Sequence, residues 1–246
     1  MHERPILFSS QMVNAILREV DPKTQTRRLI KLQPEHGAVV TPHGDGFLVE
    51  HWPKCERMMM NFGRCENIVC PYGRPGDRLW VRETFCIGYE HTKGQYTALP
   101  FSGCEEFRRA LYRADGGDPP DEPQRYWKPS IFMPRWASRI TLEITEVRVQ
   151  RLQDISEEDA IAEGMRTAAG DERGGHKWEG IGYEGGKPGY FHVSDYDAKR
   201  CRCKLGGPTP AQCAYHDLWD SINAKRTPWS SNPFVWCVSF RRLQNG

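Results

Sequence analysis

The stretch Arg139-Ile140-Thr141-Leu142-Glu143-Ile144-Thr145-Glu146-Val147-Arg148-Val149 carries the longest β signal in the chain. Its apolar residues Ile140, Leu142 and Ile144 alternate with polar ones, as in a strand with one buried face. The sequence then predicts a short helix over residues 156–163, because a serine cap and an acidic first turn precede a glycine.

Shorter β signals lie on both sides of this stretch. The spacing of apolar residues predicts strands over residues 5–8, 38–41, 46–49, 78–83, 110–114 and 234–240, and helices over 11–20 and 211–223. Many strands with few helices favour a small β-barrel with helices packed on it. The predicted fold class is therefore mixed α/β, mainly β.

The 246 residues exceed what a small barrel needs. Stretches rich in turn residues predict large loop insertions around residues 51–75, 87–125 and 165–210 of a single domain spanning 1–246. A net charge of +2 gives no global sign of a nucleic-acid binder, so any basic patch must be local. No apolar run is long enough to span a membrane.

The N-terminus lacks the charged and apolar regions of a signal peptide, which predicts a cytoplasmic protein. In that compartment the nine cysteines are expected to be reduced thiols or metal ligands. One candidate zinc set is Cys201, Cys203, Cys213 and His216, and another is His51, Cys55, Cys65 and Cys70. Any zinc is expected to be structural, and the alternative is a scatter of free thiols.

Chemically active groups gather in Lys23-Thr24-Gln25-Thr26-Arg27-Arg28, directly after the first predicted helix. Thr26 is a candidate nucleophile with Lys23 as its base, since a threonine hydroxyl needs a group that takes its proton. The two arginines can hold a phosphate or polarise a carbonyl oxygen. A regular strand would put Lys23 and Thr26 on opposite faces, so this pairing requires a turn. The alternative is a solvated basic turn.

This stretch, together with the strand over 76–81, the strand and helix over 140–163, and the closing strand over 234–240, resembles the ASCH family, and in particular its longer members in phages and prophages. The resemblance implies a PUA-like barrel, a fold related to RNA-binding domains. Compact bacterial members of the family are amidohydrolases that remove acyl groups from N4-acetylcytidine. Their proposed catalytic set corresponds to Lys23, Thr26 and Glu163 here, and Arg28 matches an arginine facing the substrate.

Other residues are candidates for binding the base. Arg27 and Arg28 follow the catalytic stretch, while Trp80, Arg82 and Glu83 lie in and beside the strand over 78–83. Trp80 and the further aromatic residues Tyr112, Trp127 and Trp136 can stack on a base or instead fill the core.

The expected function is a metal-independent amidohydrolase acting on N4-acylated cytosine, as a modified nucleoside or base, with no catalytic cofactor. Thr26 would be the nucleophile, Lys23 the base and Glu163 a proton relay or orienting group. One alternative is an RNA- or DNA-binding module or ribonuclease that uses its basic residues on phosphates. Another is an accessory protein that contacts other proteins and has no turnover.

Overall fold

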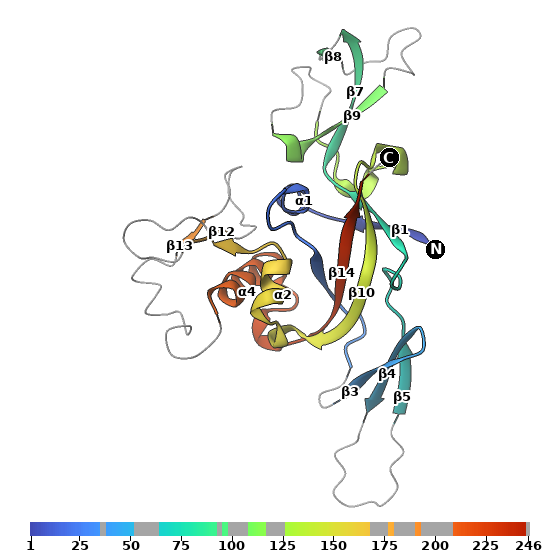
Figure 1. Ribbon diagram of the computed structural model, residues 1–246, viewed down its shortest axis with the longest axis vertical. Helices are drawn as coiled ribbons and strands as arrows, with labels where there is room; N and C mark the ends of the chain where they lie inside the picture. The colour runs from blue at the N-terminus through green and yellow to red at the C-terminus, as the bar shows by residue number, and fades with distance from the viewer. Residues whose placement is uncertain are drawn as a thin grey trace, which may run out of the picture.

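The computed structural model describes residues 1–34, 38–51, 64–92, 95–97, 108–116, 126–167, 177–179, 190–192 and 209–244. A five-stranded sheet with the order β1-β6-β10-β14-β2 forms its centre (Figure 1). These strands are β1 (Glu3–Leu7), β6 (Arg78–Arg82), β10 (Thr141–Arg151), β14 (Phe234–Leu243) and β2 (Gln25–Leu29). β1 and β6 are parallel, and the other neighbours are antiparallel.

The long strand predicted from the alternating stretch is β10, which pairs with β14 along its whole length. Leu142 and Ile144 are buried, as the alternation predicted. The register shifts between Ile144 and Glu146. A shift of this kind is a bulge, which bends a strand and increases its twist.

The described sheet is open, so the prediction of a closed barrel was wrong. β1 and β2 are its two edge strands. Where a barrel would join them by backbone hydrogen bonds, a side chain makes the contact: Arg28 Nη2 donates to the carbonyl oxygen of Leu7 at 2.6 Å. The described part of the molecule is thus mixed α/β and mainly strands.

Helices cover both faces of the sheet. α1 (Ser10–Leu17) packs Val13 and Ile16 into a core with Val238 and Phe240 of β14. On the opposite face lie α2 (Glu157–Ala162) and α4 (Pro210–Asn223), whose core includes the alternate β14 residue Cys237. The period of two along β14 therefore separates two cores.

Three small antiparallel sheets lie in and beside the stretches that were predicted as loops. They comprise β3 (Val39–His43), β4 (Gly46–His51) and β5 (Arg64–Ile68); β8 (Gln95–Thr97), β7 (Phe85–Thr92) and β9 (Arg108–Tyr112); and β11 (Arg166–Thr167), β12 (Lys177–Glu179) and β13 (Tyr190–His192). The strands predicted over residues 38–41 and 46–49 are confirmed as β3 and β4, which pair as a hairpin. Figure 1 shows the first two sheets extending from opposite ends of the central sheet.

Short 3-10 helices connect several of these elements. They are η2 (Arg113–Asp115), η3 (Ser130–Phe132), η4 (Arg135–Ala137), η5 (Leu152–Asp154) and η7 (Trp229–Ser231). Within the described ranges, every helix is too short or too polar to cross a bilayer.

Candidate active site

Lys23 lies just before the edge strand β2. α1 ends at Leu17, earlier than predicted, because Arg18 leaves the helical conformation, and Asp21 then takes a positive φ of 47°. The Lys23 amide donates to Ala15 O at 2.9 Å, and the strand begins only at Gln25. The alternation of the strand therefore does not govern Lys23.

Glu163 meets Lys23 from the end of α2, where it is the C-cap residue. Lys23 Nζ donates to Glu163 Oε2 at 2.5 Å and to Glu163 O at 2.7 Å. Both residues are buried, with Lys23 only 1% exposed. Burial lowers the pKa of Lys23, although the charge and hydrogen bond of Glu163 oppose this shift. Lys23 is thus easier to deprotonate than an exposed lysine.

A buried guanidinium links the strand to the same helix. Arg27 donates to Asp159 Oδ2 at 2.7 Å and lies 3.5 Å from Glu163 Oε1. Asp159 and Glu163 are four residues apart, so successive turns of α2 present them on one side. Asp159 also accepts from Arg148 Nη2 and Gln25 Nε2, each at 2.9 Å. Burial raises the pKa of Asp159, but these hydrogen bonds and the Arg27 charge outweigh it and hold the pKa below its usual value.

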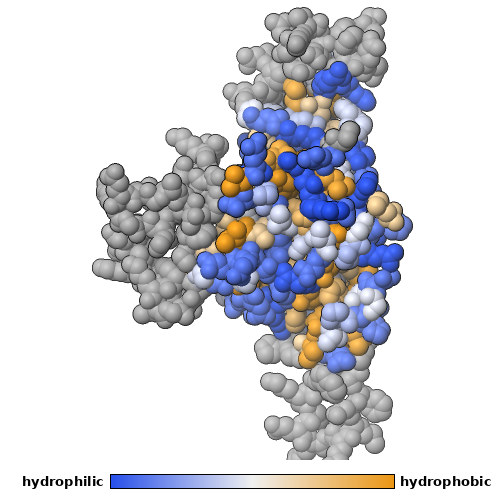
Figure 2. Space-filling model, in the orientation of Figure 1, coloured by the Kyte–Doolittle hydropathy of each residue, from blue (hydrophilic) through white to orange (hydrophobic). Residues whose placement is uncertain are grey.

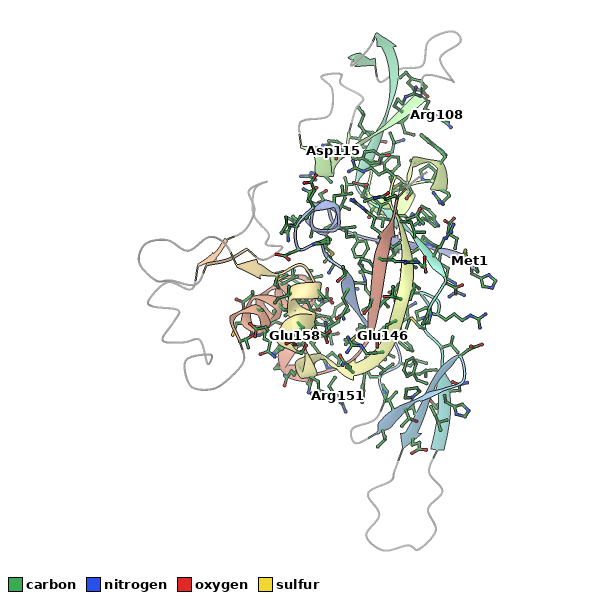
Figure 3. The ribbon with its side chains drawn as sticks, in the orientation of Figure 1. Met1, Arg108, Asp115, Glu146, Arg151 and Glu158 are labelled. Atoms are coloured by element: carbon green, nitrogen blue, oxygen red, sulfur yellow. The ribbon has the colours of Figure 1, made fainter. Side chains whose placement is uncertain are left out.

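A pocket of about 100 Å³ opens beside this network at the free edge of β2. Its wall comprises Met12, Thr26, Arg27, Arg28, Leu29, Glu163, Tyr215, Leu218, Trp219, Ile222 and Asn223. Lys23 is absent from these described lining residues and lies behind Glu163. The apolar part of the wall comes mainly from α4, which lies beside α2 in Figure 3, where Glu158 marks the smaller helix.

Three buried polar atoms of the pocket residues have no hydrogen-bond partner. They are Glu163 Oε1, an acceptor when ionised, and two donors, Arg27 Nε and Arg28 Nε. Unpaired buried polar atoms cost about 1–3 kcal/mol each. A ligand that offered a donor and an acceptor to these atoms would recover that cost.

A second nucleophile candidate, the Cys237 thiol, lies close to this network. It donates to Gln150 Oε1 at 3.3 Å, and burial raises its pKa to about 12. A neutral thiol is a poor nucleophile. Thr26 therefore remains the candidate nucleophile in the pocket wall.

The structure does not bring all predicted site residues together. Arg27, Arg28, Thr26 and Glu163 line the pocket, with Lys23 behind them. Trp80, Arg82 and Glu83 are not among these lining residues. The Arg82 guanidinium lies 5.2 Å from the Trp80 ring centroid and donates to backbone carbonyls of η3 and its C-cap. Glu83 is buried and forms an ion pair with Arg139.

The other aromatic candidates also lie outside the lining. Trp136 is 47% exposed, Trp127 is half-buried, and the Tyr112 hydroxyl donates to Ala137 O at 2.8 Å.

The predicted zinc sets are only partly within the described residues. Cys213 is a half-buried cysteine on α4, and on the same helix His216 lies 3.3 Å from Asp220. Cys201, Cys203 and Cys55 fall outside the described residues, the side chains of His51 and Cys65 are likewise not described, and Cys70 is a buried free thiol. Among the described side chains, no three histidine, cysteine or acidic groups are placed to hold a metal ion.

Sequence reasoning missed Asp159, Arg148 and Tyr215. The last has a fully buried ring centred 5.7 Å from the Arg27 guanidinium. The four-residue spacing of Asp159 and Glu163 on a predicted helix was an available signal for two carboxylates on one face. Nothing in the sequence pairs Arg148 or Tyr215 with them, since these contacts arise from the tertiary fold.

Comparison with known proteins adds no relative. No protein-family model, curated protein or solved structure matches this chain.

Proposed function

We propose that this protein is an amidohydrolase that removes the acyl group from N4-acylated cytosine nucleosides or bases. The observation that carries the proposal is the buried Lys23–Glu163 pair behind a pocket whose wall contains Thr26. The pocket combines a hydroxyl, a carboxylate and a guanidinium with an apolar side from α4, a composition suited to a neutral aromatic ligand with one reactive amide.

The reaction begins with attack of Thr26 Oγ1 on the acyl carbonyl carbon. The hydroxyl proton passes to the Lys23–Glu163 pair, with Lys23 as the base that its lowered pKa favours and Glu163 as the group nearer the pocket. Arg28 is the candidate for stabilising the oxyanion, because its Nε is buried without a partner.

The bond between the acyl carbon and N4 then breaks. The Lys23–Glu163 pair returns the proton to the departing nitrogen, which leaves as the amine of cytosine. Water hydrolyses the resulting ester on Thr26, with the same pair taking one proton from water and giving one back to Thr26 Oγ1. The net reaction consumes one water and releases a carboxylic acid and cytosine or cytidine.

Burial of the basic residues weakens the rival use of this stretch on phosphates. The side chains of Lys23 and Arg27 are 0% exposed, and both cations are already paired with carboxylates. Phosphate contacts need cations that reach the solvent. Of the three predicted phosphate ligands, only Arg28 is partly exposed.

The test is turnover of N4-acetylcytidine, followed by the ultraviolet spectrum as it converts to cytidine. We expect turnover by the parent and a loss of at least about 100-fold in Thr26→Ala and Glu163→Gln, since the nucleophile and the proton relay are each essential. Thr24→Ala and Glu158→Gln are the matched controls, because they remove an exposed hydroxyl two residues before Thr26 and an exposed carboxylate from α2, the helix that Glu163 caps. The proposal fails if the parent turns over no N4-acylcytosine, or if Thr26→Ala is as active as Thr24→Ala.

A further inference from the structure

Exposed aromatic rings also occur on a surface that is distinct from the described pocket lining. Among the described residues, the only phenylalanine, tyrosine or tryptophan side chains in the exposed class are Tyr126, Phe132 and Trp136, which are 66%, 68% and 47% exposed. All three fall within residues 126–136. Large apolar groups scattered singly are ordinary, but a group of exposed rings indicates an interaction surface.

Arginine side chains stack on the rings in this region. The Arg108 guanidinium lies 4.2 Å from the centroid of Trp136, and Arg82 and Arg135 lie 5.2 Å and 5.8 Å from that of Trp80. Such contacts hold a positive charge beside an aromatic ring. Figure 3 places Arg108 in the upper part of the molecule, where Figure 2 shows hydrophilic and apolar residues interleaved.

Contacts between segments join these groups into one surface. Arg82 on β6 donates through Nε to Met133 O at 3.1 Å and through Nη2 to Ile131 O. The segment that carries these carbonyls continues into η4, where Arg135 and Trp136 contact β6 and β9 respectively. We call this the aromatic–arginine surface and define it by Trp80, Arg82, Arg108, Phe132, Arg135 and Trp136.

The charge of the surface is positive within the described residues. The surface contains Arg82, Arg108 and Arg135. Two further exposed arginines, Arg109 on β9 and Arg113 on η2, lie near Arg108 in the chain. At one end of the surface Glu3, itself partly exposed, binds Arg135 at 2.8 Å. Salt screens such exposed pairs, and a polyanion can compete for the cation.

We propose that the aromatic–arginine surface binds single-stranded nucleic acid. Unpaired bases stack on aromatic and guanidinium planes, and the neighbouring arginines meet the phosphates. A duplex keeps its bases stacked inside, and an acidic peptide offers no base to stack. An anionic membrane would favour rings gathered in one apolar area, whereas here arginines separate them. This proposal does not depend on the hydrolase activity proposed above.

Contacts at the end of β1 connect the surface to the pocket wall. Leu7 of β1 pairs with Arg82 in the sheet, and its carbonyl oxygen accepts from Arg28 in the pocket wall. The Arg28 guanidinium also lies 5.1 Å from the centroid of Phe8, whose amide donates to Arg82 O. The end of β1 is therefore the boundary between the two sites.

The test measures binding of the full chain to fluorescently labelled single-stranded RNA and DNA by anisotropy over a series of salt concentrations. We expect tighter binding to single strands than to a duplex of the same sequence, with affinity falling as salt rises. Phe132→Ala and Trp136→Ala should each weaken binding about tenfold, a typical loss per stacking ring. Arg108→Ala should reduce the slope of log affinity against log salt by about 0.7.

Matched controls separate the surface from general effects of mutation. Val69→Ala removes an exposed apolar side chain elsewhere, and Arg226→Ala removes an exposed cation beyond the end of α4; both should bind as the parent does. Thr26→Ala should retain binding, and Phe132→Ala should retain any turnover of free N4-acetylcytidine, so either proposal can fail alone.

Three outcomes would overturn the proposal. They are equal affinity in the parent and both ring variants, equal affinity for single strands and duplex, and binding to phosphatidylserine vesicles or polyglutamate without binding to either nucleic acid.

Discussion

The Lys23–Glu163 pair places two ionisable groups in the protein interior. Removing both from water costs several kcal/mol per ion, and their attraction repays this only when the geometry is good. Here Lys23 Nζ reaches two oxygens of Glu163, but Glu163 Oε1 has no hydrogen-bond partner. That oxygen lies 3.5 Å from Arg27 Nη1, so a second buried cation helps to balance the charge of the carboxylate.

Replacing one partner of this pair should be more harmful than replacing both. Lys23→Met should lower the free energy of unfolding by about 3–5 kcal/mol, since it leaves a buried carboxylate without its cation. The double variant Lys23→Met/Glu163→Leu should recover much of that loss. Urea denaturation measures both values. Arg74→Met, which breaks the exposed pair with Asp45, is the control and should cost at most about 1 kcal/mol. A double variant as unstable as Lys23→Met would contradict this account.

Lys23, Thr26 and Glu163 were chosen together through a family resemblance. In the structure Lys23 contacts Glu163, and Glu163 and Thr26 line the same pocket. The burial of Lys23 was not predictable, because lysines are almost always exposed unless paired, and the partner lies far away in the sequence. Trp80, Arg82 and Glu83 were assigned from their strand alone, which does not show what the strand faces.

Among the elements, the end of α2 positions Glu163. Gly164 follows with a φ of 100°, and its carbonyl oxygen accepts from Arg18 Nη1 at 3.1 Å. Glycine adopts this conformation freely, whereas a side chain strains it. The backbone turn at Gly164 thus fixes the position of Glu163 at the end of α2.

Gly164→Ala should therefore affect both stability and activity. The strain should cost about 1–3 kcal/mol in the free energy of unfolding. Displacement of Glu163 should lower turnover of N4-acetylcytidine by about 100-fold, the scale expected for a misplacement of about 1 Å. Gly116→Ala is the matched control, because Gly116 has a φ of 81° and open space around its Cβ position and is not among the described pocket-lining residues. It should lose similar stability without losing activity; equal turnover in the two variants would refute the role given to Gly164.

Elements with strong local periodicity were the ones that the sequence could predict. β10, β14, α4 and the β3–β4 hairpin all carry a clear apolar period or a turn signal. β5, β7 and β8 were missed. β5 and β8 are short, and most of β7, although eight residues long, lies within a stretch that its turn residues marked as a loop. The closed barrel was an inference from the number of strands, and strand number does not determine whether two edges meet.

On the scale of the whole molecule, the partly buried Arg139 links the β8-β7-β9 sheet to the central sheet. Arg139, just before β10, binds both oxygens of Glu83 at 3.0 Å and Asp115 at 2.7 Å. Its guanidinium also lies 3.9 Å from the centroid of Tyr112. Beside it, Phe85, Met133 and Ala137 form a small separate core. The attachment of this sheet thus combines a limited apolar core with an ionic contact.

Because Glu83 titrates, the stability lost on removing Arg139 should depend on pH. Burial raises the pKa of Glu83, and the hydrogen bonds and charge of Arg139 oppose that shift. The Arg139→Met variant lacks the hydrogen bonds and charge that lower the Glu83 pKa, so its folded state favours a protonated Glu83. A carboxyl with a raised folded pKa favours folding at low pH, and this contribution is lost as pH rises through that pKa.

Arg139→Met should therefore cost more stability at pH 8, about 3 kcal/mol, than at pH 5. Urea unfolding followed by tryptophan fluorescence at the two pH values measures the difference. Glu83→Gln/Arg139→Met removes the titrating group, so its cost relative to the parent should depend much less on pH. A cost of Arg139→Met that is the same at both pH values would show that the ring contact and the apolar core, rather than the buried ion pair, hold the two sheets together.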